Sequence, residues 1–302
     1  MIDPSLFPAL LSLSAVARSG SVGAAARQQH LTPSAISQQI RKVEIALGVK
    51  LLERAGRGVR LTAAGEAMLP ALARLWGEAE ALFGELAVFS GRPITTIRVA
   101  VSDYLGDALL VPVLRSFADR REPARFEIVT THSRDALSRV ARGETGFGVV
   151  SATAIPSGLD QRFLFNQTFV WVGPRSRRRR RETLVDRLAR EPLLRLGAES
   201  QGRHLLDEFL ERAGIRPRST IDVTSVSLLL SYVSGGLGVG LAPSLALRDG
   251  IRRSVVVEPA DVPPTPVQLV SRPISRRNPV SARFADAVVA EGRALAARLA
   301  GR

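Results

Sequence analysis

Residues 21–47 constrain this chain most, because they predict two helices joined by a tight turn, in a stretch that reads SVGAAARQQHLTPSAISQQIRKVEIAL. Thr32 stands at an N-cap position and Pro33 follows at the first helical position, so the second helix is expected to begin there. The apolar residues that then recur at steps of four, three and four, and so share one packed face, are Ile36, Ile40, Val43 and Leu47. Residues 22–29, with Ser21 as their cap, supply the helix against which that face packs.

The opposite face of the second helix is polar and basic. Its residues are Ser34, Ser37, Gln38, Arg41 and Lys42. Hydroxyls and an amide near the N-terminus, with cations one turn later, suit a helix that meets base edges in the major groove of DNA while its cations meet phosphates. A solvated face is the alternative for a single helix with this pattern. Arg54, Arg57 and Arg60 favour the DNA interpretation, because they lie where a β-hairpin wing would contact the backbone.

A long linker helix is expected from Thr62, which can cap it, to about Phe89. Its apolar residues alternate steps of three and four, which predicts a heptad seam for dimerisation. The seam residues are Leu69, Leu72, Trp76, Ala79, Phe83 and Leu86. The alternative is that the helix packs on its own domain, because so short a heptad run is a weak coiled-coil pattern. A dimer is favoured, since pairing two reading helices requires two copies of the chain. Pro70, in the second turn of the helix, either kinks it or marks its true start.

Residues 93–302 alternate strands and helices, which predicts two α/β lobes with parallel sheets and a cleft between them. Strands are expected at 97–101, 126–130, 146–150, 163–172, 193–196, 220–223, 239–242 and 266–272, and helices at 105–117, 133–142, 182–190, 204–213, 226–234 and 282–299. The predicted domains are therefore a winged helix-turn-helix at 1–61, a linker helix and hinge at 62–92, and a two-lobed domain at 93–302. Its first lobe is expected at about 93–165 and 273–302 and its second at about 170–268.

Polar residues follow the predicted strands at their carboxyl ends, where open α/β sheets bind ligands. They are Ser102 and Asp103, Thr131 to Ser133, Ser200 to Gly202, and Thr224 with Ser225. Ordinary N-capping explains any one of them, but their coincidence at corresponding ends predicts a site for a small polar or anionic molecule. The glycines of GGLGVG at 235–240 do not predict a dinucleotide site, because a helix precedes them and a strand follows. The arginine run at 177–181 is expected to be a solvated loop.

Composition excludes several classes of function. There is no cysteine, the three histidines lack metal-ligand spacing, and no nucleophile–base or paired-carboxylate pattern is found, so we expect no catalytic residue, no metal and no cofactor. The net charge of +14 favours polyanions, but residues 1–61 carry only +5 of it and residues 93–302 carry +11, so charge alone does not locate a DNA site. No signal peptide and no apolar run long enough to cross a bilayer is visible, so a soluble, cytoplasmic protein without a membrane partner is expected.

The sequence resembles the LysR-type transcriptional regulators over its whole length, most strongly in residues 19–65 and again in SYVSGGLGVGLAP at 231–243. The resemblance implies a winged-helix head, a dimerising linker helix and a regulatory domain of the periplasmic-binding-protein type. It also implies promoter DNA and a small effector as partners, a homodimer or homotetramer, and RNA polymerase as a further candidate partner.

By position, the resemblance places one set of residues near DNA: Ser21, Thr32, Ser34, Ser37, Gln38 and Arg41, with Arg54 and Arg57 in the wing. It places Ser102, Ser133, Gln201 and the strand around Val267 at the effector pocket, to which Thr224 is added from the strand ends. Pro33 stands where the family often has glutamine, Gln38 where arginine is common and Gly146 where aspartate is frequent, so base contacts and one part of the pocket are expected to differ.

Three hypotheses follow. The first is a DNA-binding regulator that senses a small polar or anionic molecule, the second is a regulator that works without a ligand through protein contacts, and the third is a solute-binding or enzymatic module in the second half of the chain.

Overall fold

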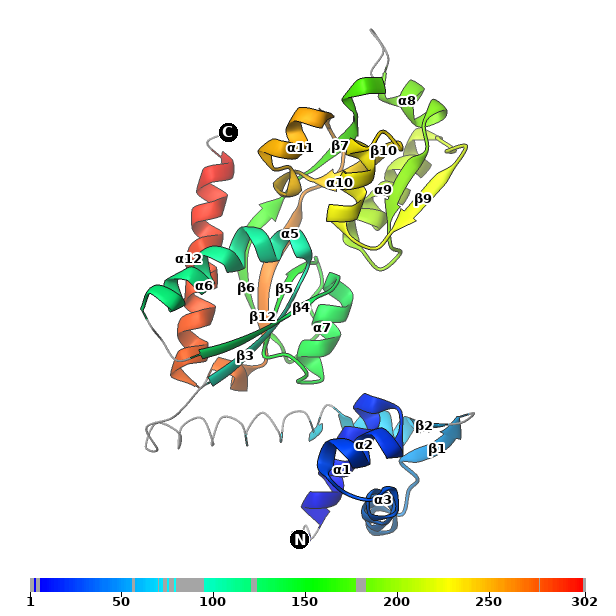
Figure 1. Ribbon diagram of the computed structural model, residues 1–302, viewed down its shortest axis with the longest axis vertical. Helices are drawn as coiled ribbons and strands as arrows, with labels where there is room; N and C mark the ends of the chain where they lie inside the picture. Colours follow the sequence, from blue (N-terminus) through cyan, green and yellow to red (C-terminus); the bar gives the residue numbers. More distant parts are fainter. Residues whose placement is uncertain are drawn as a thin grey trace. The chain divides into compact units, whose positions relative to one another are not determined.

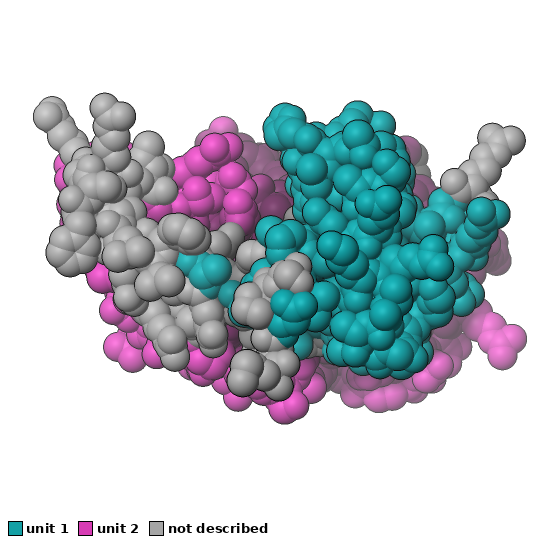
Figure 2. All heavy atoms as spheres, turned by 90° about the horizontal axis from the view of Figure 1, so that it is seen from below, with its two compact units in different colours: residues 1–80 teal, residues 81–302 magenta. Residues whose placement is uncertain are grey.

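The chain divides into two compact units, Met1–Glu80 and Ala81–Arg302, in a computed structural model (Figure 1, and coloured by unit in Figure 2). The structure describes residues 3, 6–55, 58–69, 71, 72, 75, 79, 95–120, 124–177, 183–276 and 278–300. Each unit has its own hydrophobic core.

The first unit contains three helices and a two-stranded hairpin. They are α1 (Phe7–Ser19), α2 (Val22–Gln29), α3 (Pro33–Leu47), β1 (Leu52–Ala55) and β2 (Gly58–Leu61), followed by helical residues 63–69. The predicted caps are confirmed: the Ser21 hydroxyl accepts a hydrogen bond from the Ala24 amide, and the Thr32 hydroxyl accepts one from the Ala35 amide at 3.2 Å. The sequence thus defines the starts of both helices locally.

The core of the first unit lies between its three helices. Ile36, Ile40 and Val43 of α3 are buried, as predicted, against the small side chains of Ala25 and Ala26, which let α2 approach closely. Leu47 was expected on the same face, but it is 51% exposed. That expectation is wrong because Leu47 occupies the last helical position, immediately before Gly48 ends α3 in the left-handed conformation.

The linker region begins as predicted, since the Thr62 hydroxyl accepts a hydrogen bond from the Gly65 amide. Leu72, however, is only 4% exposed and packs in the core of the first unit, and Leu69 is half-buried. Leu72 therefore supports the head itself and is not free for a dimer seam. Trp76, Phe83 and Leu86, the other predicted seam residues, lie outside the described residues, as do Pro70 and the end of the helix.

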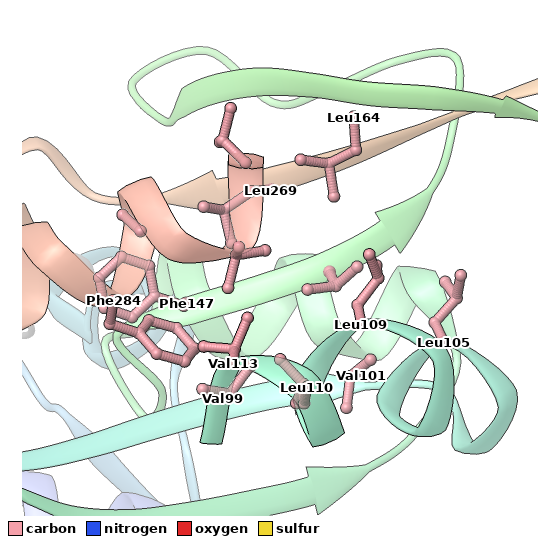
Figure 3. Packing of buried hydrophobic residues seen from close by; sticks show 14 of the residues in the cluster. Val99, Val101, Leu105, Leu109, Leu110, Val113, Phe147, Leu164, Leu269 and Phe284 are labelled. Carbon is pink, nitrogen blue, oxygen red and sulfur yellow. The ribbon is translucent and has the colours of Figure 1, made fainter. Parts of the chain in front are cut away.

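The first lobe of the second unit is a five-stranded sheet in the order β4-β3-β5-β12-β6. Its strands are β3 (Thr95–Val101), β4 (Ala124–Thr130), β5 (Phe147–Ser151), β6 (Asp160–Gln167) and β12 (Thr265–Ser271). One face is covered by α5 (Asp103–Leu105), the π-helical segment η2 (Gly106–Leu110), α6 (Val111–Asp119) and α12 (Pro279–Ala300), and the other by α7 (Ser133–Ala141). Phe284 of α12 packs on Phe147 of β5 in this core, with ring centroids 5.2 Å apart (Figure 3).

The second lobe has the strand order β11-β7-β10-β8-β9. Its strands are β7 (Phe169–Pro174), β8 (Leu193–Leu196), β9 (Thr220–Val223), β10 (Val239–Pro243) and β11 (Val255–Pro259). Helices α8 (Leu184–Arg190) and α9 (Gln201–Ala213) cover one face, and α10 (Val226–Ser234) and α11 (Asp249–Ser254) the other. Short 3-10 turns η3 (Arg175–Arg177), η4 (Ser244–Ala246) and η5 (Pro273–Arg276) complete the unit.

Both sheets are mixed, which corrects the predicted parallel sheets. β12 pairs antiparallel with β5 and β6, and β7 pairs antiparallel with β10 and β11. The chain crosses between lobes at Thr168 and returns before Thr265, so the whole of β12 belongs to the first lobe and the predicted end of the second lobe near 268 is too late. The predicted long strand at 163–172 is split at Thr168 by this crossing, and α11 and β11 were not predicted.

Candidate nucleic-acid interface and ligand pocket

The outer face of α3 is exposed along its length. Thr32, Pro33, Ser34, Ser37, Gln38, Arg41 and Lys42 are all exposed, and Ser21 is half-buried as the cap of α2. The Ser37 hydroxyl donates to the Pro33 carbonyl at 2.9 Å, and the hydroxyls of Thr32 and Ser34 lie 3.0 Å apart. Gln38, Arg41 and Lys42 form no side-chain hydrogen bond or ion pair within the described residues, so their polar groups are available to a partner.

The β1–β2 hairpin forms the wing. Glu53 and Arg60 face each other in its register, and the Arg60 Nε donates to the Glu53 carboxylate at 2.6 Å. Arg54 is exposed and has no ion pair with any residue that the structure describes. Arg57 lies between the strands and outside the described residues. The two described wing arginines therefore differ, because Arg60 is already paired with a carboxylate and Arg54 is not.

A buried carboxylate that sequence reasoning missed joins α3 to the wing. Glu44 is 9% exposed, and its Oε1 accepts hydrogen bonds from the amides of Leu51 at 2.9 Å and Leu52 at 3.4 Å, while Lys50 donates to its Oε2 at 2.8 Å. Burial acts to raise the pKa of this carboxyl, but the Lys50 and backbone hydrogen bonds outweigh it and leave the pKa below its usual value of 4.5. The only sequence signal was an acidic residue beside the apolar stripe of α3.

A cavity of about 380 Å³ lies between the lobes of the second unit. The starts of α7, α9 and α10 border it, with N-caps His132, Ser200 and Ser225. Helix N-termini carry partial positive charge and free amides, which favour an anion. Apolar side chains form part of the wall: Phe169, Leu196, Val226 and Pro243. The volume is within the range of small-molecule sites.

Four of the five predicted pocket residues line this cavity: Ser102, Ser133, Gln201 and Thr224. Val267 does not, because its side chain is 0% exposed and belongs to the core of the first lobe. It pairs with the lining residue Ser151 in the sheet, but its buried side chain packs in the core, so we remove it from the site. Ser151 and Gln167 line the cavity but were not predicted. Each lies at the end of a strand, and only the tertiary structure shows which strand lies beside it.

Ser151 has a buried hydroxyl at the wall of the cavity. Its amide donates to the Ser133 hydroxyl at 2.9 Å, but its own Oγ is buried and has no hydrogen-bond partner among the residues that the structure describes. A buried hydroxyl without a partner is costly, and a bound molecule would satisfy it. Tyr104, also on the wall, donates its hydroxyl to Gln167 Oε1 at 2.8 Å, and burial raises its pKa, so the phenol stays neutral and holds the amide in place.

Polar contacts bridge the two lobes around the cavity. Asp103 Oδ2 accepts a hydrogen bond from the Ser227 amide at 3.0 Å, in the first turn of α10. Arg134 pairs with Glu199 at 2.6 Å, next to the lining residues Ser133 and Ser200. Arg248 pairs with Asp107, and the hydroxyls of Thr168 and Ser244 lie 2.7 Å apart at the crossing. The lobes therefore meet through several separate contacts of modest size.

The glycine-rich segment 235–240 is a turn, as predicted. It follows α10 and leads directly into β10. Gly238 has a φ of +155°, and a Cβ there would lie 2.0 Å from the Pro192 carbonyl oxygen. The glycine thus permits a close approach of two backbone segments.

Among the described residues, no helix combines the length and hydrophobicity that a membrane span requires. Within the same part of the chain, no three histidine or acidic side chains gather where they could hold a metal ion.

Comparison with known proteins identifies the two units. The model for the LysR substrate binding domain matches residues 90–293, and the model for the bacterial regulatory helix-turn-helix protein of the lysR family matches residues 8–66. The HTH-type transcriptional regulator TfdS of Cupriavidus pinatubonensis is 30% identical over 247 residues, covering 76% of this chain and 79% of that protein.

Two full-length structures share the fold. The regulator LysG of Corynebacterium glutamicum with bound effector Arg has a TM-score of 0.68 at 22% identity, covering 96% of this chain and 98% of that one. CbnR, complexed with its target DNA, has a TM-score of 0.59 at 22% identity, covering 94% of this chain and 99% of that one.

Proposed function

The chain belongs to the LysR family of bacterial transcriptional regulators, and we propose that it reads promoter DNA with the outer face of α3 and answers to a small anionic effector held between its lobes. It is a transcriptional regulator with a helix-turn-helix DNA-binding domain and an effector-binding domain. The relatives are regulators rather than enzymes, so a catalytic role for the second unit is not supported.

For DNA, the proposal assigns sequence reading to α3 and affinity to the wing. Gln38 has an exposed amide that forms no hydrogen bond within the described part of the chain, which suits a bidentate contact with a base edge. Arg41 and Lys42 follow one turn later, where phosphates would lie. Ser34 and Ser37 add hydroxyls, with Thr32 and Pro33 at the helix start and Ser21 at the start of α2. Arg54 and Arg57 are assigned to the DNA backbone. CbnR, which shares the fold, has been solved with its target DNA.

Selection of bound duplexes from a random pool tests this division. Gln38→Ala should change the preferred sequence, because a bidentate contact supplies roughly 1–3 kcal/mol of discrimination against the wrong base. Arg54→Ala should weaken binding to all sequences alike. An unchanged preference in Gln38→Ala would remove Gln38 from the reading surface and leave the wing assignment intact.

For the effector, one observation supports the proposal above others: the buried, unpartnered Ser151 hydroxyl lies in a cavity that three helix N-termini border. A carboxylate placed there would meet the free amides at the starts of α7 and α9 and the side chains of Ser133 and Gln201. LysG, of the same fold, binds the effector Arg, a molecule with one carboxylate. Ser102 and Thr224 complete the polar part of the proposed site.

Thermal unfolding with a panel of small carboxylates tests the effector proposal. A ligand present at one hundred times its dissociation constant adds about 2.7 kcal/mol to the stability of the second unit. Ser151→Ala should reduce the shift, whereas Ser116→Ala, a half-buried serine on α6 outside the cavity, should leave it unchanged. Absence of any shift across the panel would favour the ligand-independent regulator.

The oligomer and location follow from the same proposal. A chain with one reading helix gains half-site pairing by dimerising, and we assign the seam to Leu69, Trp76, Phe83 and Leu86 in a homodimer that pairs further into a tetramer. Its DNA partner places the protein in the cytoplasm, where RNA polymerase is a candidate partner at the promoter.

A further inference from the structure

Asp103 sets the charge that the cavity accepts. We propose that this carboxylate makes the site selective for molecules with a single anionic group and excludes dianions. The inference rests on the proposed effector function and names the chemical class of the effector.

Asp103 reaches the start of α10 from the other side of the cavity. It lines the cavity from the first lobe, at the start of α5, yet its Oδ2 accepts the Ser227 amide of α10 in the second lobe at 3.0 Å. The neighbouring Leu228 amide is bonded to the Ser225 hydroxyl at 3.2 Å. The start of α10 is therefore already occupied by a carboxylate of the protein, which sits where an anionic ligand group would otherwise bind.

Two other helix starts at the cavity can present positive potential to a ligand. The starts of α7 and α9 are left, and their caps, His132 and Ser200, bond only the third amide of each helix. Together with the unpartnered Ser151 hydroxyl, they provide one polar corner of the cavity that can hold one carboxylate.

A second anionic group on the ligand would not be neutralised by the described lining residues. No lysine or arginine is among the described residues that line the cavity, and Phe169, Leu196, Val226 and Pro243 make part of its wall apolar. A second carboxylate would face either this apolar wall, where an unpaired charge is costly, or Asp103, which repels it. A cationic or hydroxyl group at that end of the ligand would instead have a carboxylate to bind. The cavity therefore suits a monocarboxylate or a zwitterion with one carboxylate.

Butyrate and succinate test the inference, because they have the same four-carbon length and differ in one carboxylate. The full-length protein is titrated with each at pH 7.5, where succinate is a dianion, and binding is followed by ¹H–¹⁵N NMR at the amides of Ser133 and Gly202. In the unmodified protein, butyrate should bind more tightly than succinate. Asp103→Asn keeps an acceptor for the Ser227 amide but removes the charge, and it should lower the succinate-to-butyrate ratio of dissociation constants by roughly tenfold.

Asp107→Asn is the matched control. Asp107 is also a carboxylate that bridges the lobes, through Arg248, but it does not line the cavity. Its variant should leave the ratio unchanged, and an equal change in both variants would attribute the effect to lobe closure and overturn the inference. Asp103→Ser provides a second uncharged variant if Asp103→Asn folds poorly.

The outcomes separate the two proposals. If both probes bind and Asp103→Asn leaves the ratio as it was, charge selection by Asp103 is refuted while the anion site stands. If neither probe perturbs the cavity amides in any variant, the anion site itself fails and the inference fails with it.

Discussion

The two described arginines of the wing should contribute unequally to DNA affinity, and the salt dependence of binding measures the difference. Arg54 is exposed and free of ion pairs within the described residues, whereas Arg60 donates to Glu53 at 2.6 Å across the hairpin. Each phosphate that a free cation neutralises releases counterions, which contributes about 0.9 to the slope of log K against log salt. Arg54→Ala should therefore reduce the slope by about 0.9 per protomer.

The same arithmetic gives the size of the effect. Raising salt from 50 to 200 mM weakens binding by about 3.5-fold for each phosphate contact. Over this range, the fold-loss of affinity should therefore be smaller for Arg54→Ala than for the unmodified protein, by a factor of about 3.5. Arg60→Ala should change the slope less, because the Glu53 carboxylate already offsets the Arg60 charge. Glu53→Gln is the reciprocal change, and it should steepen the slope because it frees Arg60 and removes an anion from the DNA-facing hairpin.

Fluorescence anisotropy with a labelled random-sequence duplex, titrated at several salt concentrations, is the appropriate assay, since phosphate contacts do not depend on sequence. Circular dichroism of each variant checks that the head remains folded. Equal slopes for Arg54→Ala and the unmodified protein would show that Arg54 does not meet phosphate. A shallower slope in Glu53→Gln would refute the role given to the ion pair.

Four further predictions concern stability and assembly. Glu44→Leu should lower the opening free energy of α3 by about 2–3 kcal/mol, measured by hydrogen exchange, because it leaves the buried Leu51 amide without an acceptor. Since the folded-state pKa of Glu44 lies below 4.5, the stabilisation of the fold by its ionised carboxylate is present at neutral pH and is lost as the pH falls below that value. Glu44→Gln should remove this contribution to the pH dependence of stability. Gly173→Ala should destabilise the second unit by about 1–3 kcal/mol in thermal unfolding, because the new Cβ would lie 1.5 Å from the buried Arg187 guanidinium. Trp76→Glu should yield monomers by light scattering if the linker seam exists, and an unchanged dimer would place the interface elsewhere.

Local signals explain what the sequence predicted well. The bounds of α2 and α3 follow from Ser21, Thr32 and Pro33, whose capping chemistry acts within one helical turn. The carboxyl ends of parallel strands likewise place Ser102 and Ser133 at a common edge, wherever each strand ends up in the sheet. These features required no knowledge of tertiary structure.

Pairing between distant segments explains what the sequence did not predict. Nothing local shows that β12, which follows the second lobe, returns antiparallel beside β5, so Val267 could be placed near the pocket but not recognised as core. The same limit hid Ser151, whose hydroxyl matters only because β5 ends beside α7. Glu44 was missed because its partners, the amides at the start of the wing, become neighbours only after folding.

The strength of the contacts between the lobes decides between an effector-dependent and a ligand-independent regulator. Arg134–Glu199 has side chains 68% and 47% exposed, and Arg248–Asp107 has side chains 65% and 51% exposed. Exposed ion pairs of this kind contribute about 0–1 kcal/mol each, which is no more than the differential affinity of a small ligand, typically about 1–3 kcal/mol. A ligand that prefers one lobe arrangement can therefore shift the population appreciably. These two exposed ion pairs therefore leave room for a ligand to change the lobe arrangement, which favours an effector domain that responds to its ligand.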